Sequence, residues 1–76
     1  MTSDDIKTLL VESFSDADIL VEGEGAKFLI EITSNAFLGK RAVARQQMVY
    51  AVLNDHISSG EIHAVTMKLK TNEESA

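Results

Sequence analysis

Residues 18–33, DILVEGEGAKFLIEIT, contain two runs of alternating side chains separated by a glycine-rich tetrapeptide. Alternation with a period of two is typical of a strand with one buried face, because successive side chains point to opposite sides. In the second run, Phe28, Ile30 and Ile32 fall on one face. Residues 23–26 (GEGA) supply the backbone freedom that a chain reversal needs. We therefore predict a β-hairpin that buries one face.

An amphipathic helix is predicted on the N-terminal side of this hairpin. Residues 3–14 can be capped by Ser3 or Thr2, and they carry two aspartates in the first turn, where the helix dipole favours negative charge. Its apolar residues recur at helical spacing and are Ile6, Leu9, Leu10 and Phe14. One face of this helix should therefore pack on the hairpin.

A short and a long helix are predicted after the hairpin. Residues 34–37 (SNAF) are long enough for one helical turn, which Gly39 interrupts. Residues 40–57 (KRAVARQQMVYAVLNDHI) have no helix breaker and carry an apolar stripe at steps of three and four. The stripe consists of Val49, Val52, Leu53 and Ile57. Arg45 lies one turn before this stripe, near the start of the helix.

The remaining segments define the fold class. A turn at residues 58–60 (SSG) ends the long helix, and a third strand is predicted from Ile62, followed by a polar tail at residues 72–76. Residues 1–71 then form one domain with the order α-β-β-α-α-β. Two helices between the second and third strands are long enough for a crossover to a parallel neighbour. We predict an α+β fold, in which helices cover one face of a three-stranded mixed sheet.

The period of two divides the last strand into two faces. One face carries His63, Val65, Met67 and Leu69, and the other carries Ile62, Ala64, Thr66, Lys68 and Lys70. Because the second set ends in lysines, we expect the first set to face the helices, with His63 at the rim of the sheet. Position alone favours a half-packed rim histidine that is hydrogen-bonded to a nearby loop. The alternative is an imidazole available to a metal or a partner.

Composition limits the chemistry of the chain. It has 76 residues and no cysteine, so it forms no disulfide and no thiolate metal site of its own. His56 is more typical of a surface residue at the end of a helix than of a ligand. His63 and scattered carboxylates do not provide the three or four ligands that zinc or iron requires. A metal bound at His63 would therefore need ligands from another molecule.

Charge and patterning argue against several function classes. The N-terminus is acidic, unlike a signal peptide, and no apolar run approaches the length of a membrane span, so we expect a cytoplasmic protein with no membrane contact. The net charge of −5 repels nucleic acid outside a local basic patch, such as residues 40–45 or Lys68 with Lys70. No nucleophile elbow and no phosphate-binding glycine loop are present, so we expect no enzyme.

The segment FLGKRAVARQQMVYAVL, residues 37–53, resembles the BolA-like family. Phe37, Gly39 and Arg45 fit its F-x-G-x₅-R pattern, and residues 62–71 (IHAVTMKLKT) fall where the family has a histidine-bearing strand. The resemblance covers roughly residues 4–71. The Gln46-Gln47 pair is more similar to the IbaG (YrbA) branch than to BolA itself.

The resemblance implies a class II KH-like arrangement, in which the third strand lies beside the second. Phe37 would anchor the short helix on the sheet, Gly39 would permit the turn into the long helix, and both roles are architectural. Arg45 would project near the entry to the last strand.

The resemblance also implies a partner and a cofactor. BolA-like proteins pair with monothiol glutaredoxins, and a [2Fe-2S] cluster can bridge the two proteins. The glutaredoxin cysteine and a glutathione thiol hold one side, and His63 matches the histidine that the BolA-like protein contributes. Arg45 and Lys27 are candidates for the partner-facing surface. The expected role is iron–sulfur trafficking, or iron or stress sensing.

Two positions depart from the family pattern. Lys27 stands where relatives commonly offer a second His or Cys ligand, so Glu22, Glu24 or an exogenous ligand substitutes, or the complex is mostly cluster-free. The chain also ends in an acidic segment, where relatives often continue into a basic one. The sequence leaves open whether the free protein is a monomer or a weak homodimer.

The alternative function is that of a KH-like transcriptional regulator that binds nucleic acid. Residues 39–42 (GKRA) lack the second glycine of the loop that clamps nucleic acid in KH domains. Gln46 and Gln47 also replace a basic pair expected in BolA. We therefore rank this function second.

Overall fold

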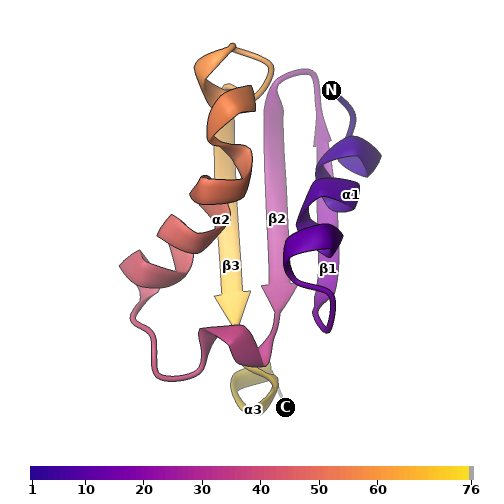
Figure 1. Ribbon diagram of the computed structural model, residues 1–76. Helices are drawn as coiled ribbons and strands as arrows, with labels where there is room; N and C mark the ends of the chain where they lie inside the picture. Colours follow the sequence, from indigo (N-terminus) through magenta and orange to yellow (C-terminus); the bar gives the residue numbers. More distant parts are fainter. Residues whose placement is uncertain (76) are drawn as a thin grey trace.

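The computed structural model describes residues 1–75, with the backbone alone for Glu24 and Ser75. Figure 1 shows its helices and strands in chain order. The elements are α1 (Ser3–Ser13), β1 (Asp18–Glu24), β2 (Lys27–Thr33), η1 (Asn35–Phe37), α2 (Ala42–Ser58), β3 (Ala64–Lys70) and α3 (Asn72–Ser75). The predicted element order is confirmed, and one helical turn follows it.

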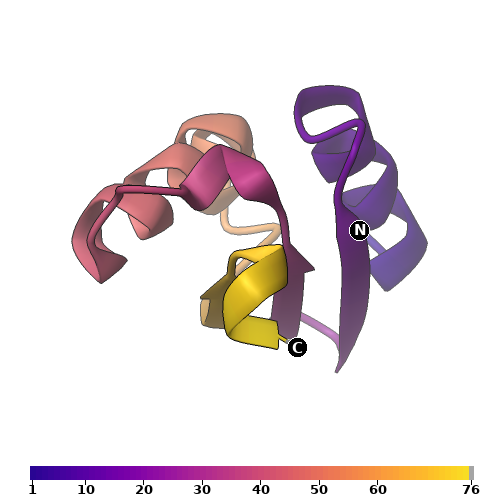
Figure 2. The same cartoon turned by 90° about the horizontal axis from the view of Figure 1, so that it is seen from below.

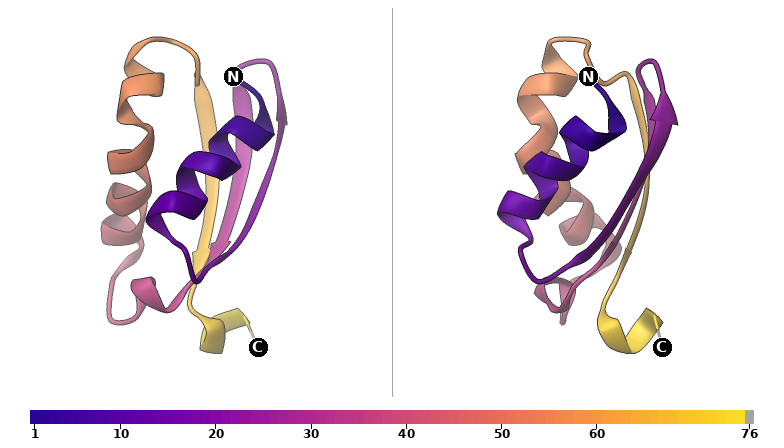
Figure 3. Two further views of the ribbon diagram at one scale, coloured as in Figure 1. Left: turned by 45° about the vertical axis from the view of Figure 1, so that its right-hand side comes forward. Right: turned by 90° about the vertical axis from the view of Figure 1, so that its right-hand side faces the viewer.

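The three strands form one mixed sheet in the order β1-β2-β3. β1 is antiparallel to β2, and β2 is parallel to β3, as the crossover length predicted. Both α1 and α2 lie on one face of the sheet, and no helix of the described residues covers the other face (Figures 2 and 3). The α+β prediction is therefore confirmed.

The hairpin buries the face that its sequence predicted. Phe28, Ile30 and Ile32 of β2 are buried in the core, under α1 and α2. Gly23 permits a close approach of the two strands, because its φ is 150° and a Cβ there would lie 2.2 Å from the carbonyl oxygen of Lys27. No L side chain fits that contact, so glycine is required at this position.

The helices pack as their spacing predicted. Thr2 caps α1 in a capping box with Asp5, and Ile6 and Leu10 are buried against the sheet. In α2, the stripe residues Val49 and Leu53 are buried, while Val52 and Ile57 are partly buried. The apolar side of α2 thus packs on β3 and against α1.

The predicted phase of the third strand is wrong at its start. Ile62 is only 1% exposed and belongs to the core, whereas His63 is exposed and lies outside β3. The backbone explains the shift, because the amides of His63 and Ala64 both donate to the Ala26 carbonyl, at 2.7 and 3.1 Å. Two successive amides with one acceptor break the alternation of a strand. From Ala64 onward the predicted alternation holds.

Candidate functional site

His63 lies at the end of the sheet that also carries the hairpin turn. Its amide is held by the Ala26 carbonyl, and the next residue, Ala64, pairs with Lys27 of β2. The side chain is exposed, and within residues 1–75 no hydrogen bond holds its imidazole. The structure therefore brings His63 and Lys27 to one rim and leaves the imidazole nitrogens accessible.

The loop before His63 is braced by a polar cluster. Glu61 accepts a hydrogen bond from the Ser59 hydroxyl at 3.0 Å and lies 3.2 Å from Nδ1 of His56. The Ser59 and His56 contacts lower the pKa of Glu61. The amide of Ile62 also donates to the His56 carbonyl, at 3.1 Å. These bonds, together with the buried Ile62, fix the backbone that presents His63.

The donor set in this chain is small. Residues 1–75 contain no group of three or more His, Cys, Asp or Glu side chains arranged to hold a metal ion. Glu22 lies on the uncovered face of the sheet, opposite Leu29, two pairs further along the hairpin than Lys27. Within residues 1–75, His63 therefore belongs to no group large enough to hold a metal, and a metal bound there needs further ligands from another molecule.

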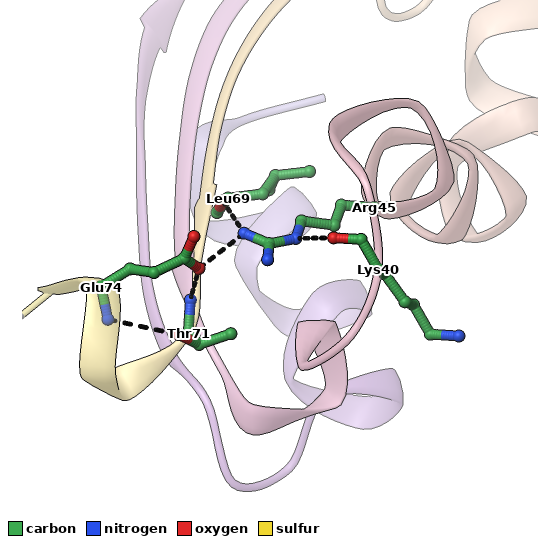
Figure 4. A network of polar contacts seen from close by, with 5 residues as sticks. All are labelled: Lys40, Arg45, Leu69, Thr71 and Glu74. Carbon is green, nitrogen blue, oxygen red and sulfur yellow. Dashed lines mark hydrogen bonds and ion pairs between the residues drawn. The ribbon is translucent and has the colours of Figure 1, made fainter.

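Arg45 lies at the other end of β3, contrary to the prediction that it projects near the strand's entry. Its Nε donates to the Lys40 carbonyl at 2.8 Å, and its Nη1 donates to the Leu69 carbonyl at 3.1 Å (Figure 4). The reason is that α2 runs antiparallel to β3, so the helix starts where the strand finishes (Figure 1). The structure therefore does not bring Arg45 and His63 together.

Glu74 falls in the segment that the sequence predicts to be a polar tail, but it is the ionic partner of Arg45. The two side chains lie 2.7 Å apart, and the Arg45 side chain is only 13% exposed. Glu74 also accepts from the Thr71 amide at 2.8 Å, while its own amide donates to the Thr71 hydroxyl. The Thr71 and Arg45 hydrogen bonds lower the pKa of Glu74 to about 2. The threonine-to-glutamate spacing of a capping box is the signal that could have revealed this turn.

The other two motif residues shape the turn before α2. Phe37 is fully buried, with its ring centroid 5.6 Å from that of Phe14. The Arg45 guanidinium lies over the same ring, 5.9 Å from its centroid. Gly39 has a φ of 76°, a left-handed conformation that favours glycine. Phe37, Gly39 and Arg45 together fix the approach of α2 to the end of β3.

Comparison with known proteins decides the family. The sequence pattern of the BolA-like proteins matches residues 5–74. The chain belongs to the BolA-like family. It is 49% identical over 74 residues to a protein from the rpoN-murA intergenic region of Acinetobacter guillouiae, covering 97% of this chain and 89% of that one.

Two further comparisons support the assignment. The chain is 33% identical over 74 residues to the acid stress protein IbaG of Escherichia coli K12, covering 97% of this chain and 88% of IbaG. The structure of a BolA homologue from Coxiella burnetii matches with a TM-score of 0.85 at 32% identity, covering 99% of this chain and 96% of the other. The resemblance to the family and its IbaG branch is confirmed.

Within residues 1–75, none of the helices has the length and apolar character needed to cross a lipid bilayer.

Proposed function

We propose that this protein is an adaptor, not an enzyme, that binds a monothiol glutaredoxin and supplies His63 as a ligand to a shared [2Fe-2S] cluster. The observation that carries the proposal is the exposed imidazole of His63 on a backbone fixed by the Ala26 carbonyl. A ligand held on rigid backbone loses little freedom on binding. The proposed role is iron–sulfur trafficking, or iron or stress sensing, in the cytoplasm.

The donor set fits a shared cluster better than a resident one. One imidazole with no further cluster of donors in residues 1–75 suits a site whose other ligands belong to another molecule. In the proposed complex, the glutaredoxin cysteine and glutathione supply those ligands. A histidine ligand in place of a thiolate raises the reduction potential of an iron–sulfur cluster, as in Rieske centres.

Lys27 shapes the surroundings of the proposed ligand. It is exposed at the rim and pairs with Ala64, the residue that follows His63. A protonated lysine does not ligate iron, but its positive charge suits contact with the anionic glutathione. Lys27 is therefore proposed as a partner-facing residue. The Arg45 guanidinium is hydrogen-bonded to Leu69 and Glu74 at the far end of β3. We therefore propose that Arg45 stabilises the surface at that end and does not contact the cluster.

The test is reconstitution of [2Fe-2S] on a monothiol glutaredoxin with glutathione, followed by visible absorption and circular dichroism. Adding the wild-type protein is expected to change the spectrum, and adding His63→Ala is not. His56→Ala is the histidine control: it removes the side-chain contact with Glu61 but keeps the backbone bonds of Ile62 and His63 and the His63 imidazole, so it should still change the spectrum. Identical spectra for wild type and His63→Ala would overturn the proposal.

Nucleic-acid binding is the second candidate, and one observation favours it. Four exposed basic side chains lie near the start of α2 or the end of β3, namely Lys40, Arg41, Lys68 and Lys70, of which Lys68 is paired with Glu31. A complex that depends on phosphate contacts weakens steeply as the salt concentration rises. A salt titration with a single-stranded oligonucleotide, compared with one using the glutaredoxin, separates the two functions.

A further inference from the structure

The outer edge of β3 is an unpaired sheet edge beside His63. The sheet order is β1-β2-β3, so within residues 1–75 β3 has a neighbouring strand on one side only. The amide of Ala64 points towards β2, because it donates a hydrogen bond to the Ala26 carbonyl. The carbonyl of Lys70 points the same way, because it accepts a hydrogen bond from the Ser34 amide. In β3, the backbone amides and carbonyls of the even-numbered residues thus bond to β2, and those of the odd-numbered residues point away from the sheet.

The contacts of Arg45 confirm this direction and limit the free edge. The Leu69 carbonyl points outward and is occupied by Nη1 of Arg45 at 3.1 Å. At the opposite end, the amide of His63 is occupied by the Ala26 carbonyl. Between these ends, in the part of the chain that the structure describes, the outward amides and carbonyls of Val65 and Met67 have no backbone partner.

The side chains of this edge are also incompletely covered. On the helix-facing side of β2, Phe28, Ile30 and Ile32 are buried, whereas the corresponding residues of β3, including Val65 and Met67, are only partly buried. A groove of about 320 Å³ follows the edge between β3 and α2. It is lined by Lys40, Ala42, Gln46, Met67 and Leu69, and closed by Arg45 with Glu74. The side chains of an added strand could therefore pack on the partly exposed apolar side chains of β3.

Charge complementarity indicates what occupies this edge. The chain has a net charge of −5, yet five of its seven basic residues come from the start of α2 and the end of β3. These five are Lys40, Arg41, Arg45, Lys68 and Lys70. Arg45 is paired with Glu74 and Lys68 with Glu31, so an incoming segment would meet mainly the positive charges of Lys40, Arg41 and Lys70. The other sheet edge, β1, carries Asp18 and Glu22 instead. An acidic segment is attracted to the β3 edge and repelled by the β1 edge.

We infer that an acidic, extended segment of the partner protein adds to the sheet along Val65 and Met67. Main-chain hydrogen bonds to an exposed edge provide affinity in this mode of recognition, and alternate side chains provide specificity. The inference rests on the proposed function, since it places the docked segment beside His63, where the remaining cluster ligands are needed. A second copy of this chain fits less well, because antiparallel pairing of two β3 strands along Val65 and Met67 would set each Lys68 opposite Ala64 of the other copy, with no acidic side chain in β3 for it to meet.

The alternation of amides gives a direct test by hydrogen exchange followed by NMR. In the free protein, the amides of Val65 and Met67 should exchange fast, while those of Thr66 and Lys68, bonded to β2, should exchange slowly. Cluster-free monothiol glutaredoxin with glutathione is then added. Slowed exchange at Val65 and Met67, by about tenfold or more, is the expected result.

The possible outcomes separate the inference from the proposed function. A complex that forms without protecting Val65 and Met67 overturns the edge inference and leaves the adaptor function standing. If neither the cluster-free nor the cluster-loaded glutaredoxin forms a complex, both fail. Protection of these amides by a single-stranded oligonucleotide, with none by the glutaredoxin, overturns the inference in favour of nucleic acid.

A pair of variants provides a second measurement. Met67→Pro removes the outward amide without removing a bond to β2, and Met67→Leu keeps that amide with a similar side chain. Once circular dichroism shows both variants folded, Met67→Pro should bind glutaredoxin about tenfold more weakly or worse, and Met67→Leu should bind like wild type. Equal binding by the two variants would contradict the inference.

Discussion

Nη1 of Arg45 lies 2.7 Å from Oε1 of Glu74, 29 positions further along the chain. The ion pair joins the first turn of α2 to the helical turn α3 and closes the groove at the end of β3 (Figure 4). Arg45 also holds the Leu69 carbonyl, so the same side chain blocks the last outward acceptor of the strand. Arg45 therefore stabilises the fold at the end of β3 that lies opposite His63.

Acidification is expected to release α3. The pKa of Glu74 is about 2 in the folded protein and 4.5 ordinarily, so the stabilisation from its carboxylate is complete above pH 4.5 and lost as the pH falls towards 2. The NMR shift of the Thr71 amide, which donates to Glu74, reports this locally.

Glu74→Gln serves as the control for this titration. It keeps the shape of the side chain but removes the charge, so the Thr71 amide shift should no longer depend on pH between about 5 and 2. A Thr71 shift that follows a pKa near 4.5 in the wild-type protein would show that Glu74 is not paired with Arg45.

Truncating Phe37 is expected to destabilise the fold strongly. The ring is fully buried against Phe14 and Arg45, and removing a buried Phe side chain typically costs about 3–5 kcal/mol. The neighbouring Leu38→Ala is the matched control, because Leu38 is 63% exposed and should change stability by less than about 0.5 kcal/mol. Urea unfolding measures the stability of both variants. Similar unfolding midpoints for the two would show that Phe37 does not anchor the fold.

Much of the fold follows from periodicity alone. The alternation in β2 predicted its buried face, and the three- and four-residue steps in α2 predicted Val49 and Leu53 as core. Such patterns succeed because each element must bury one side, whatever its neighbours are. Phe37, the first residue of the family motif, is fully buried in this core.

The site was harder to predict, because it depends on contacts between distant residues. The exposure of His63 results from two amides sharing the Ala26 carbonyl across the sheet, which no local pattern encodes. The position of Arg45 depends on the direction in which α2 returns over the sheet. The polar composition of residues 72–76 predicts a tail, and the Thr71 capping box alone does not reveal the ion pair of Glu74, because its partner Arg45 lies far away in the chain.

The hairpin provides a test with two glycines of different surroundings. Gly23→Ala is expected to cost about 3 kcal/mol, because its Cβ would meet the Lys27 carbonyl at 2.2 Å and its φ is 150°. Gly25→Ala should cost only about 1 kcal/mol, since its φ of 62° is unfavourable but the space is open. Equal losses in urea unfolding would mean that the close approach at Gly23 is absent.

Adjacent substitutions before β3 test the corrected phase of the strand. Ile62→Ala should lower the free energy of unfolding by about 2–5 kcal/mol, because Ile62 lies in the core. His63→Ala should change it by less than about 0.5 kcal/mol, because the side chain is exposed and its hydrogen bond comes from the backbone. A larger loss of stability for His63→Ala than for Ile62→Ala would instead support the prediction from the sequence, in which His63 faces the helices.

The central claim is that the His63 imidazole binds iron in a cluster shared with the partner. The most direct measurement is pulsed electron paramagnetic resonance of the reduced complex, prepared with this protein labelled with ¹⁵N at histidine and an unlabelled glutaredoxin. We expect a strong ¹⁵N coupling in the wild type and in His56→Ala, and its loss in His63→Ala. A reduced cluster in the complex that shows no ¹⁵N coupling from this chain, or a coupling that persists in His63→Ala, would contradict the account.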